Sequence, residues 1–357
     1  MRIIVLTCAF ALFYILSLYL SKGKAKWQDR FLMLGLVLLT VLIGLRDGWP
    51  DQVVYQVAFE RAPRPWDFIT QWVEPYGYTE TGYLFLASLV KCIFDSSLFY
   101  FLSMGGLSMY LLYKGLTKYC AIPLLGLCDY MGRFLLNRDF TQMRSSLAIL
   151  LIILAIKFIY DRKLVAYMLV LLLAYQFHHL ALLGVPLYFL YKIRLSNMSI
   201  VVGLLVAMVL SQVMGGSISD VVDSYSQDLN YDTYVQDGYV EEALGLRNPM
   251  IYFQIAILLM YTFMEKRVAP KSQYYHLFRW AYFYSTLILI LFCNYTALSG
   301  RTSTVFATCE MFILPGIAMG LKKRHRTLFY IGTGLVLTYF FWSKYRSALM
   351  MMSGGML

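Results

Sequence analysis

Apolar residues run along the chain in long blocks, and short polar stretches separate one block from the next. A helix needs about 20 mostly apolar residues to cross the hydrocarbon layer of a bilayer. The fold class we expect is therefore all-α: a polytopic transmembrane helical bundle of about 11–13 membrane segments in one domain, residues 1–357. The predicted helices cover residues 3–21, 31–45, 83–113 (in one piece or two), 121–137, 144–160, 164–178, 180–191, 198–214, 250–264, 276–293, 304–320 and 327–342.

The first block has the apolar character of a secretory signal peptide. It lacks a small-residue cleavage site, however, and its lysines follow the apolar run instead of preceding it. We therefore interpret residues 3–21 as a span.

The composition agrees with a membrane protein. Apolar residues make up 60% of the chain and charged residues 14%, against roughly 45–50% and about 25% in soluble domains. The six cysteines lie in or beside apolar blocks and form no CxxC pair, so they indicate packing and neither a zinc site nor a redox motif.

The net charge of +11 would suggest nucleic-acid binding in a soluble protein, but the placement of the basic residues indicates membrane topology. They cluster in short loops between apolar blocks, and from residue 140 onward the clusters fall on every second loop. Basic loops of this kind face the cytoplasm. The clusters are Lys22, Lys24, Lys26 and Arg30; Lys114 and Lys118; Arg162 and Lys163; Lys192 and Arg194; Lys266, Arg267 and Lys271; and Lys322, Lys323, Arg324 and Arg326.

The remaining loops should face outward, and two of them are long. Residues 46–82 (outer loop 1) and 215–249 (outer loop 2) hold thirteen of the twenty acidic residues. One block too many lies between residues 82 and 137 for the charges to alternate. We expect the short run 83–94 to be re-entrant or interfacial, a geometry usually found beside a cavity.

Outer loop 1 interleaves carboxylates with aromatic rings, among them Tyr55, Tyr78 and Tyr83. Rings can stack on sugar faces while carboxylates bind hydroxyls. The alternative is an aromatic belt at the lipid interface.

Five arginines lie on the outer side or within the membrane, where the positive-inside rule does not explain them: Arg46, Arg133, Arg138, Arg144 and Arg301. Guanidinium groups that converge there suit a phosphate or pyrophosphate, which they bind bidentately. The alternative is pairing with nearby acids such as Asp129, Asp139 or Glu310.

His178 and His179 lie at an outer helix end, where one histidine could accept a proton from a hydroxyl. A structural role at the helix end is an equal alternative. Adjacent histidines do not share a helix face, so we expect no metal site. The chain has no Walker A loop, no GxGxxG after a strand and no GxSxG elbow, which leaves ATP-driven, dinucleotide-dependent and serine-hydrolase chemistry unsupported.

Several short motifs follow one another in a fixed order. They are GLR…D…Y (Gly44, Leu45, Arg46, Asp51, Tyr55), ExGY (Glu80, Gly82, Tyr83), QxR…LA (Gln142, Arg144, Leu147, Ala148), FHxxAL (Phe177, His178, Ala181, Leu182) and R…F…LP (Arg301, Phe306, Leu314, Pro315). Over roughly residues 30–320 the chain resembles the EpsG-like branch of the Wzy-type bacterial polysaccharide polymerases. It departs from that pattern at Asp47, where an aromatic residue is common, and at Leu180, where a small hydroxyl residue is common.

The resemblance implies a glycosyltransferase of GT-C-like architecture in the bacterial inner (cytoplasmic) membrane, with its active site facing the periplasm or exterior. Such an enzyme transfers a growing glycan from undecaprenyl pyrophosphate onto a lipid-linked repeat unit, without a cofactor or a metal. Its partners would be undecaprenyl-pyrophosphate-linked oligosaccharide and membrane lipids, with a flippase and a chain-length regulator as further candidates and no nucleic acid.

The resemblance also assigns expected roles. Arg144 and Arg301 would bind pyrophosphate, supported by Arg133, Arg46 and Arg138. Asp51 and Glu80, followed by His178, are the candidates for the base. The residues expected to contact the glycan are Tyr55, Tyr78, Tyr83 and Gln142.

Three alternatives remain. An O-antigen ligase would transfer the finished glycan to a different acceptor. A transporter or flippase of lipid-linked sugars tends to show inverted repeats, which we do not detect. A membrane acyltransferase could use His178.

Overall fold

The computed structural model describes residues 2–20, 25–74, 77, 79–213 and 244–352. Within these ranges every regular element is a helix, which confirms the predicted all-α class. The elements are α1 (Arg2–Leu20), α2 (Ala25–Gly44), α3 (Gln52–Glu60), α4 (Asp67–Thr70), α5 (Thr81–Ile93), α6 (Ser97–Tyr119), α7 (Pro123–Tyr130), the π-helix η1 (Met131–Leu135), α8 (Leu136–Arg138), α9 (Met143–Tyr160), α10 (Leu164–Tyr175), the 3₁₀-helix η2 (His179–Leu183), α11 (Gly184–Leu190), α12 (Asn197–Val213), η3 (Gly245–Arg247), α15 (Pro249–Phe263), α16 (Glu265–Val268), η4 (Ala269–Lys271), α17 (Tyr275–Leu291), α18 (Thr296–Ala307), α19 (Glu310–Gly320) and α20 (Lys323–Met352).

Several of these helices have the length and composition of membrane spans. Among the described residues, α1, α2 and α9 are each long and apolar enough to cross a membrane, and α18 and α19 together meet the same test across a bend of 49°. Other apolar helices are shorter, at 10–17 residues. The full number of segments expected from the sequence stays a prediction.

The outer surface of the bundle is apolar where these helices face away from the core. Leu12 of α1 is 53% exposed, Leu34 of α2 60%, Leu169 of α10 60% and Leu205 of α12 58%. Soluble monomers rarely expose apolar surface on several neighbouring elements at once. Such an exterior suits hydrocarbon better than water.

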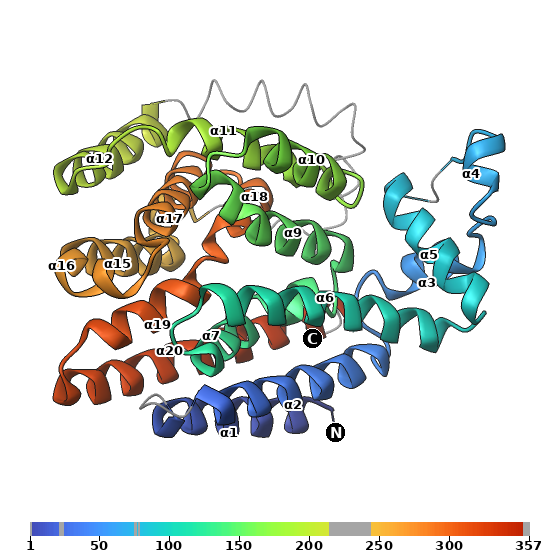
Figure 1. Cartoon of the computed structure of the whole chain (residues 1–357), viewed down its shortest axis with the longest axis horizontal. Helices are drawn as coiled ribbons and strands as arrows, with labels where there is room; N and C mark the ends of the chain where they lie inside the picture. Colours follow the sequence, from blue (N-terminus) through green and yellow to red (C-terminus); the bar gives the residue numbers. More distant parts are fainter. Residues whose placement is uncertain (1, 21–24, 75–76, 78, 214–243, 353–357) are drawn as a thin grey trace.

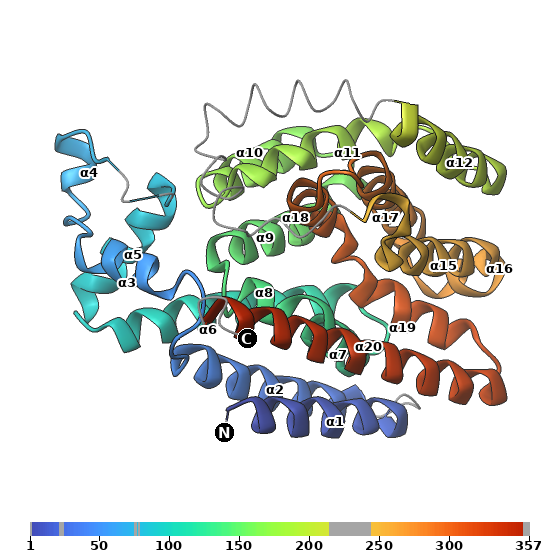
Figure 2. The same cartoon turned by 180° about the vertical axis from the view of Figure 1, so that it is seen from behind.

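The helices stack in rows, with α1 and α2 along one edge and α10, α11 and α12 along the opposite edge (Figure 1). Between these edges α6 packs on both α2 and α9, and α7 packs on α19. Seen from behind, α3, α4 and α5 form a lobe at one end of the rows (Figure 2). This lobe contains most of outer loop 1, which therefore folds into short helices.

Most predicted segments match the observed helices closely, although the helix predicted over 327–342 extends over Lys323–Met352 and the block 180–191 divides into η2 and α11. The block 83–113 divides into α5 and α6, so the alternative of two pieces is confirmed. The block 304–320, predicted as one helix, is broken between α18 and α19. The break lies in the sequence TCE. There the side-chain hydroxyl of Thr308 donates to the Thr304 carbonyl, a bond that often bends helices.

Candidate functional site

The chain turns sharply after α2 and presents Asp51 at the start of α3. Gly48 and Asp51 both have positive φ, at 70° and 60°. For a side chain other than glycine this left-handed conformation is uncommon, although aspartate tolerates it better than most residues. The turn therefore holds Asp51 in a defined position. α3 then buries Tyr55 and Phe59, four residues apart on one face.

Tyr55 belongs to a buried cluster of rings from three helices. Its ring centroid lies 5.6 Å from that of Tyr83 in α5, and the hydroxyl of Tyr100 in α6 donates to the Tyr83 hydroxyl at 2.9 Å. The guanidinium of Arg46 lies 5.9 Å from the Tyr55 ring and 4.1 Å from the Phe101 ring. The cluster fixes the inner wall of the site.

Arg46 is anchored on one side only. Its Nη1 donates to the backbone carbonyls of Asp139 at 3.0 Å and Phe140 at 3.4 Å. Its Nε and Nη2 are buried and have no hydrogen-bond partner among the described residues. Buried polar atoms without partners are costly, so this part of the site is suited to receiving a polar ligand or water.

Glu80 immediately precedes α5 and forms an ion pair with Arg144, the second residue of α9. A close helix contact brings them together. A Cβ on Gly82 would lie 2.8 Å from the backbone oxygen of Gln176, so glycine lets the start of α5 pack directly on the end of α10. Burial raises the pKa of Glu80, while the charges of Arg144 and His179 lower it.

His178 lies between α10 and η2, and η2 packs against α9, α10 and α18. The Leu180 N–H donates to Nδ1 of His178 at 3.2 Å, which leaves the proton of the neutral ring on Nε2. Burial and the positive charges of Arg144 and Arg301 lower the pKa of His178 to about 3. At neutral pH the ring is therefore an uncharged hydrogen-bond donor.

The site thus gathers charges from four separate stretches of sequence, and His178 adds an uncharged ring from a fifth. Arg46, Arg144 and Arg301 contribute three positive charges, and Asp51 and Glu80 contribute two negative charges, for a net charge of +1. Burial raises the pKa of the Tyr55 hydroxyl to about 12. The positive charge of Arg144 lowers this pKa and the negative charge of Asp51 raises it, so the hydroxyl lies near charges of both signs. The arginines of such a site can attract an anionic ligand, while the carboxylates remain beside it to accept a proton.

Arg133 lies in a second, fully buried cluster. Its Nε and Nη2 donate to the two carboxylate oxygens of Glu310 at 2.9 and 3.2 Å. The Tyr282 hydroxyl donates to the same carboxylate at 2.6 Å. Both oxygens of neighbouring Asp129 are buried, and within the described ranges they have no hydrogen-bond partner. The pairing alternative considered for Arg133 is therefore what the structure shows.

Arg138 also bonds inside the protein. Its Nη1 donates to the Thr308 hydroxyl at 2.8 Å and its Nη2 to the Thr304 carbonyl at 2.6 Å. These bonds tie the end of the π-helical segment to the broken helix pair α18–α19.

The residues expected to contact a glycan have different positions. Tyr55 and Tyr83 are buried in the ring cluster, whereas Gln142 is partly exposed at the start of α9. Tyr78 lies outside the described residues. Tyr100 was not singled out from the sequence, because it looks like one more aromatic residue of an apolar helix.

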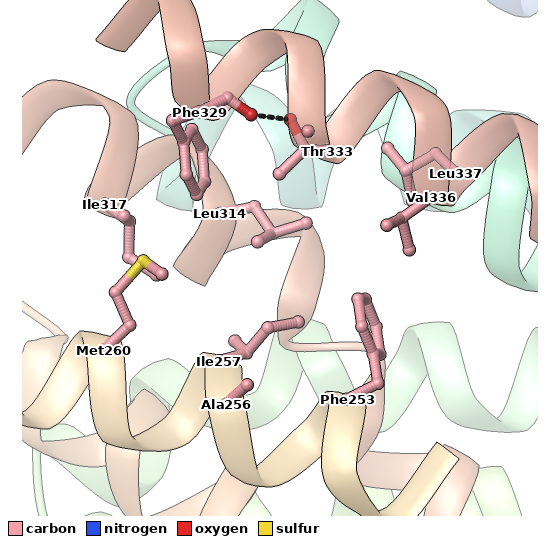
Figure 3. A pocket seen from close by; sticks show the side chains of 11 residues that line it. Phe253, Ala256, Ile257, Met260, Leu314, Ile317, Phe329, Thr333, Val336 and Leu337 are labelled. Carbon is pink, nitrogen blue, oxygen red and sulfur yellow. Dashed lines mark hydrogen bonds between the residues drawn. The ribbon is translucent and has the colours of Figure 1, made fainter. Parts of the chain in front are cut away.

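An apolar groove opens between α15 and α20, with α19 as its floor (Figure 3). It encloses about 230 Å³, and Ile257, Met260, Leu314, Ile317 and Val336 are among its lining residues. Its one hydroxyl, from Thr333, donates to the Phe329 carbonyl of the same helix at 2.7 Å. The lining of the groove is therefore suited to an apolar ligand. One lining ring, Phe253, is covered by the Arg133 guanidinium at 5.3 Å.

No group of three histidine, cysteine, aspartate or glutamate side chains is placed to hold a metal ion in the part of the chain that the structure describes.

The sequence model of the EpsG family matches residues 29–353 of the chain. No curated protein and no solved structure matches it.

Proposed function

Because the chain belongs to the EpsG family, we propose that it is a membrane-bound polysaccharide polymerase that transfers a growing glycan from undecaprenyl pyrophosphate onto a lipid-linked repeat unit. The family and the apolar helices support a membrane protein of polysaccharide biosynthesis. The specific reaction, the bacterial inner membrane and an active site that faces the periplasm or exterior are parts of the proposal.

The observation that carries the proposal is the convergence of Arg144 and Arg301 on His178, beside the carboxylates Glu80 and Asp51. A pyrophosphate leaving group develops negative charge as the glycosyl bond breaks. Fixed guanidinium groups and an uncharged N–H donor stabilise that charge without reorganising. Five sequence stretches meet at this site, and loop 1 contributes two of them.

The reaction divides among the residues as follows. The bond between the anomeric carbon of the growing glycan and the pyrophosphate oxygen breaks, and the electron pair leaves with undecaprenyl pyrophosphate. A carboxylate, Glu80 or Asp51, accepts the proton of the acceptor hydroxyl as that oxygen bonds to the anomeric carbon. The carboxylate then releases the proton to the departing pyrophosphate or to water.

His178 is a poor candidate for the proton acceptor in this scheme. Its Nδ1 already accepts a hydrogen bond, its Nε2 carries the proton, and its pKa is lowered to about 3. A general base works best with a pKa near the working pH. We therefore assign His178 the role of donor to the pyrophosphate.

The apolar groove between α15 and α20 offers a place for the isoprenoid chain of the lipid-linked donor. Its floor, Leu314 and Ile317, belongs to α19, which continues the same broken helix pair as Arg301 of α18. A rise of about 1.5 Å per helical residue separates Arg301 from Leu314 by roughly 20 Å along that pair. A polyprenyl chain whose pyrophosphate lies at Arg301 is long enough to reach the groove.

Deletion of the gene and electrophoresis of the host's surface glycan test the class of protein. A polymerase predicts that single-repeat glycan accumulates while longer chains disappear. Loss of every surface repeat would instead indicate a flippase or a ligase. A purified enzyme that extends lipid-linked repeats in detergent, without nucleotide sugar, would exclude both alternatives.

The deletion strain, complemented with a version of the gene that encodes no other cysteine, tests orientation. A cysteine at position 323 should resist a membrane-impermeant thiol reagent in intact spheroplasts, because the basic loop 322–326 is expected in the cytoplasm. Labelling of that cysteine from outside would reverse the proposed topology.

A further inference from the structure

The Glu80–Arg144 ion pair places a carboxylate on the guanidinium that the proposed reaction needs for pyrophosphate. Arg144 Nη1 donates to Oε2 of Glu80. Because Glu80 holds this nitrogen, a pyrophosphate that binds Nη1 of Arg144 has to displace the Glu80 carboxylate from it. The pair therefore requires an explanation beyond simple charge balance.

The surroundings of the pair favour an exchange of partners. The two side chains retain 11% and 10% of their exposure, so an incoming anion can reach them. Glu80 precedes the first turn of α5, where its side chain makes no capping hydrogen bond. It can therefore leave Arg144 without opening a helix end. His179 also lies near enough to act on the Glu80 carboxylate.

We infer that Glu80 occupies the pyrophosphate position on Arg144 while the site is empty, and that arrival of pyrophosphate displaces it and frees it to act as the base. The inference rests on the proposed function for the identity of the anion. Displacement couples two events: the carboxylate becomes available for the acceptor hydroxyl only when the leaving group is in place. The freed Glu80 then accepts the hydroxyl proton as the glycosyl bond to pyrophosphate breaks and the new glycosidic bond forms.

Coupling of this kind predicts an opposite effect of one substitution on binding and on rate. Glu80→Gln removes the competing negative charge and keeps the shape of the side chain. Because a unit charge a few ångströms away strongly disfavours an anion in a partly buried site, affinity for inorganic pyrophosphate should rise about tenfold or more. Turnover should nevertheless fall by about 10²–10⁴, the usual loss on removing a positioned base.

Titration of the purified full-length protein in detergent with inorganic pyrophosphate tests the inference. Glu60→Gln is the matched control, since Glu60 is an exposed acid in the same lobe whose carboxylate contacts Gln56. The control should bind pyrophosphate within about twofold of the wild type, as expected for a solvated charge. Arg144→Ala should bind it at least about tenfold more weakly, because it removes the fork itself.

The double variant Glu80→Gln with Arg144→Ala separates exchange from a general change of charge. If Glu80 acts by occupying Arg144, Glu80→Gln will not tighten binding once Arg144 is absent. Equal tightening in both backgrounds would overturn the inference, as would Glu80→Gln binding pyrophosphate no better than the wild type.

If the Glu80→Gln protein does not accumulate, Glu80→Asp takes its place in the test. The shorter side chain keeps the charge and loosens the pair, so pyrophosphate should still bind more tightly than in the wild type. Unchanged or weaker binding would contradict the exchange.

The inference and the proposed function fail separately. If Glu80→Gln binds pyrophosphate more tightly but the wild type does not polymerise, the proposed function is contradicted and the exchange is supported. If the wild type polymerises but Glu80→Gln does not bind more tightly, only the exchange is contradicted.

Discussion

Of the three arginine–glutamate pairs among the described residues, two lie near the candidate site or its supporting helices and differ in burial and in bonding. Arg133 and Glu310 are 4% and 0% exposed, bond through two nitrogens to two oxygens, and receive a third bond from Tyr282. Arg144 and Glu80 are 11% and 10% exposed and bond through Nη1 and Oε2. Near the second pair lie Arg301 and the Tyr55 hydroxyl.

The difference indicates what each pair is for. A buried pair that satisfies itself on all sides holds helices together and has no spare donor for a ligand. A partly exposed pair within a surplus of positive charge can exchange one partner for an anion. The sequence shows five similar arginines, and only their surroundings separate the structural ones from those suited to a substrate.

Breaking the deep pair should have the largest effect. Arg133→Ala or Glu310→Ala leaves a buried charge uncompensated, which costs about 3–5 kcal/mol. We expect protein that accumulates poorly and unfolds at lower temperature in detergent. Replacing both residues by methionine should recover much of that stability. If Arg133→Ala accumulates normally and only polymerisation is lost, Arg133 belongs to the substrate site after all.

Removing a carboxylate of the outer site should affect the rate and leave the fold intact. Asp51→Asn should lower turnover by about 10²–10⁴ if Asp51 shares the role of base. Asp47→Asn, an exposed acid of the same turn, should have little effect. The acids Asp220, Asp223, Asp228, Asp232 and Asp237 of outer loop 2 are expected to be dispensable and lie outside the described residues. Normal turnover by Asp51→Asn would leave Glu80 as the single carboxylate base.

Changing the shape of the outer cations should give a comparable loss. Arg144→Lys and Arg301→Lys keep the charge but lose the planar fork, so we expect polymerisation to fall by about 10²–10³. Their thermal stability should remain near that of the wild type. Wild-type chain lengths in a glycan gel from either variant would remove that residue from the site.

The pH dependence of the rate should identify the base. Burial raises the pKa of Glu80 above its ordinary 4.5, with Arg144 and His179 acting in the opposite direction. Activity should therefore fall as the pH falls through that raised pKa, because protonation removes the acceptor. His178→Gln should keep this acid limb, since the pKa of His178 is lowered to about 3. An acid limb near pH 6.5 that disappears in His178→Gln would make histidine the base.

Filling the groove should have the smallest effect. No atom lies within 4 Å of a Cβ built on Gly332, which lines the groove. Gly332→Phe should therefore fit and occupy space that an isoprenoid would use. At about 0.8 kcal/mol per buried methylene, loss of two such contacts raises KM for the lipid-linked donor about tenfold. Leu205→Phe, on the exposed face of α12 and outside the groove lining, is the control.

Much of the fold follows from the apolar blocks. The helices α1, α9, α12, α15 and α17 lie within two residues of their predicted ranges, because long apolar stretches have few other stable structures in a membrane. The 49° bend between α18 and α19 was not predictable. It depends on hydrogen bonds from Thr308 and Arg138 that a hydropathy pattern does not contain.

The site was predictable in part. The motif order singled out Asp51, Glu80, Arg144, His178 and Arg301, and the structure brings these residues together. The sequence alone did not separate Arg133, which Glu310 holds from 177 positions away. It also did not reveal that Tyr83 is buried against Tyr55 and Tyr100, since an aromatic residue at a helix start looks the same whichever way it faces.

The π-helix Met131–Leu135 makes the register of this region sensitive to chain length. A π-turn contains one more residue than an α-turn, and each α-helical residue advances the chain by about 100° around the axis. Deleting one residue from it would let α7 and α8 join as a regular helix, but it would rotate Arg138 about a quarter-turn away from Thr304 and Thr308. Apolar substitutions at Met131 or Leu135 keep this register, whereas the loss of a single codon there would detach α8 from the broken helix that carries Arg301.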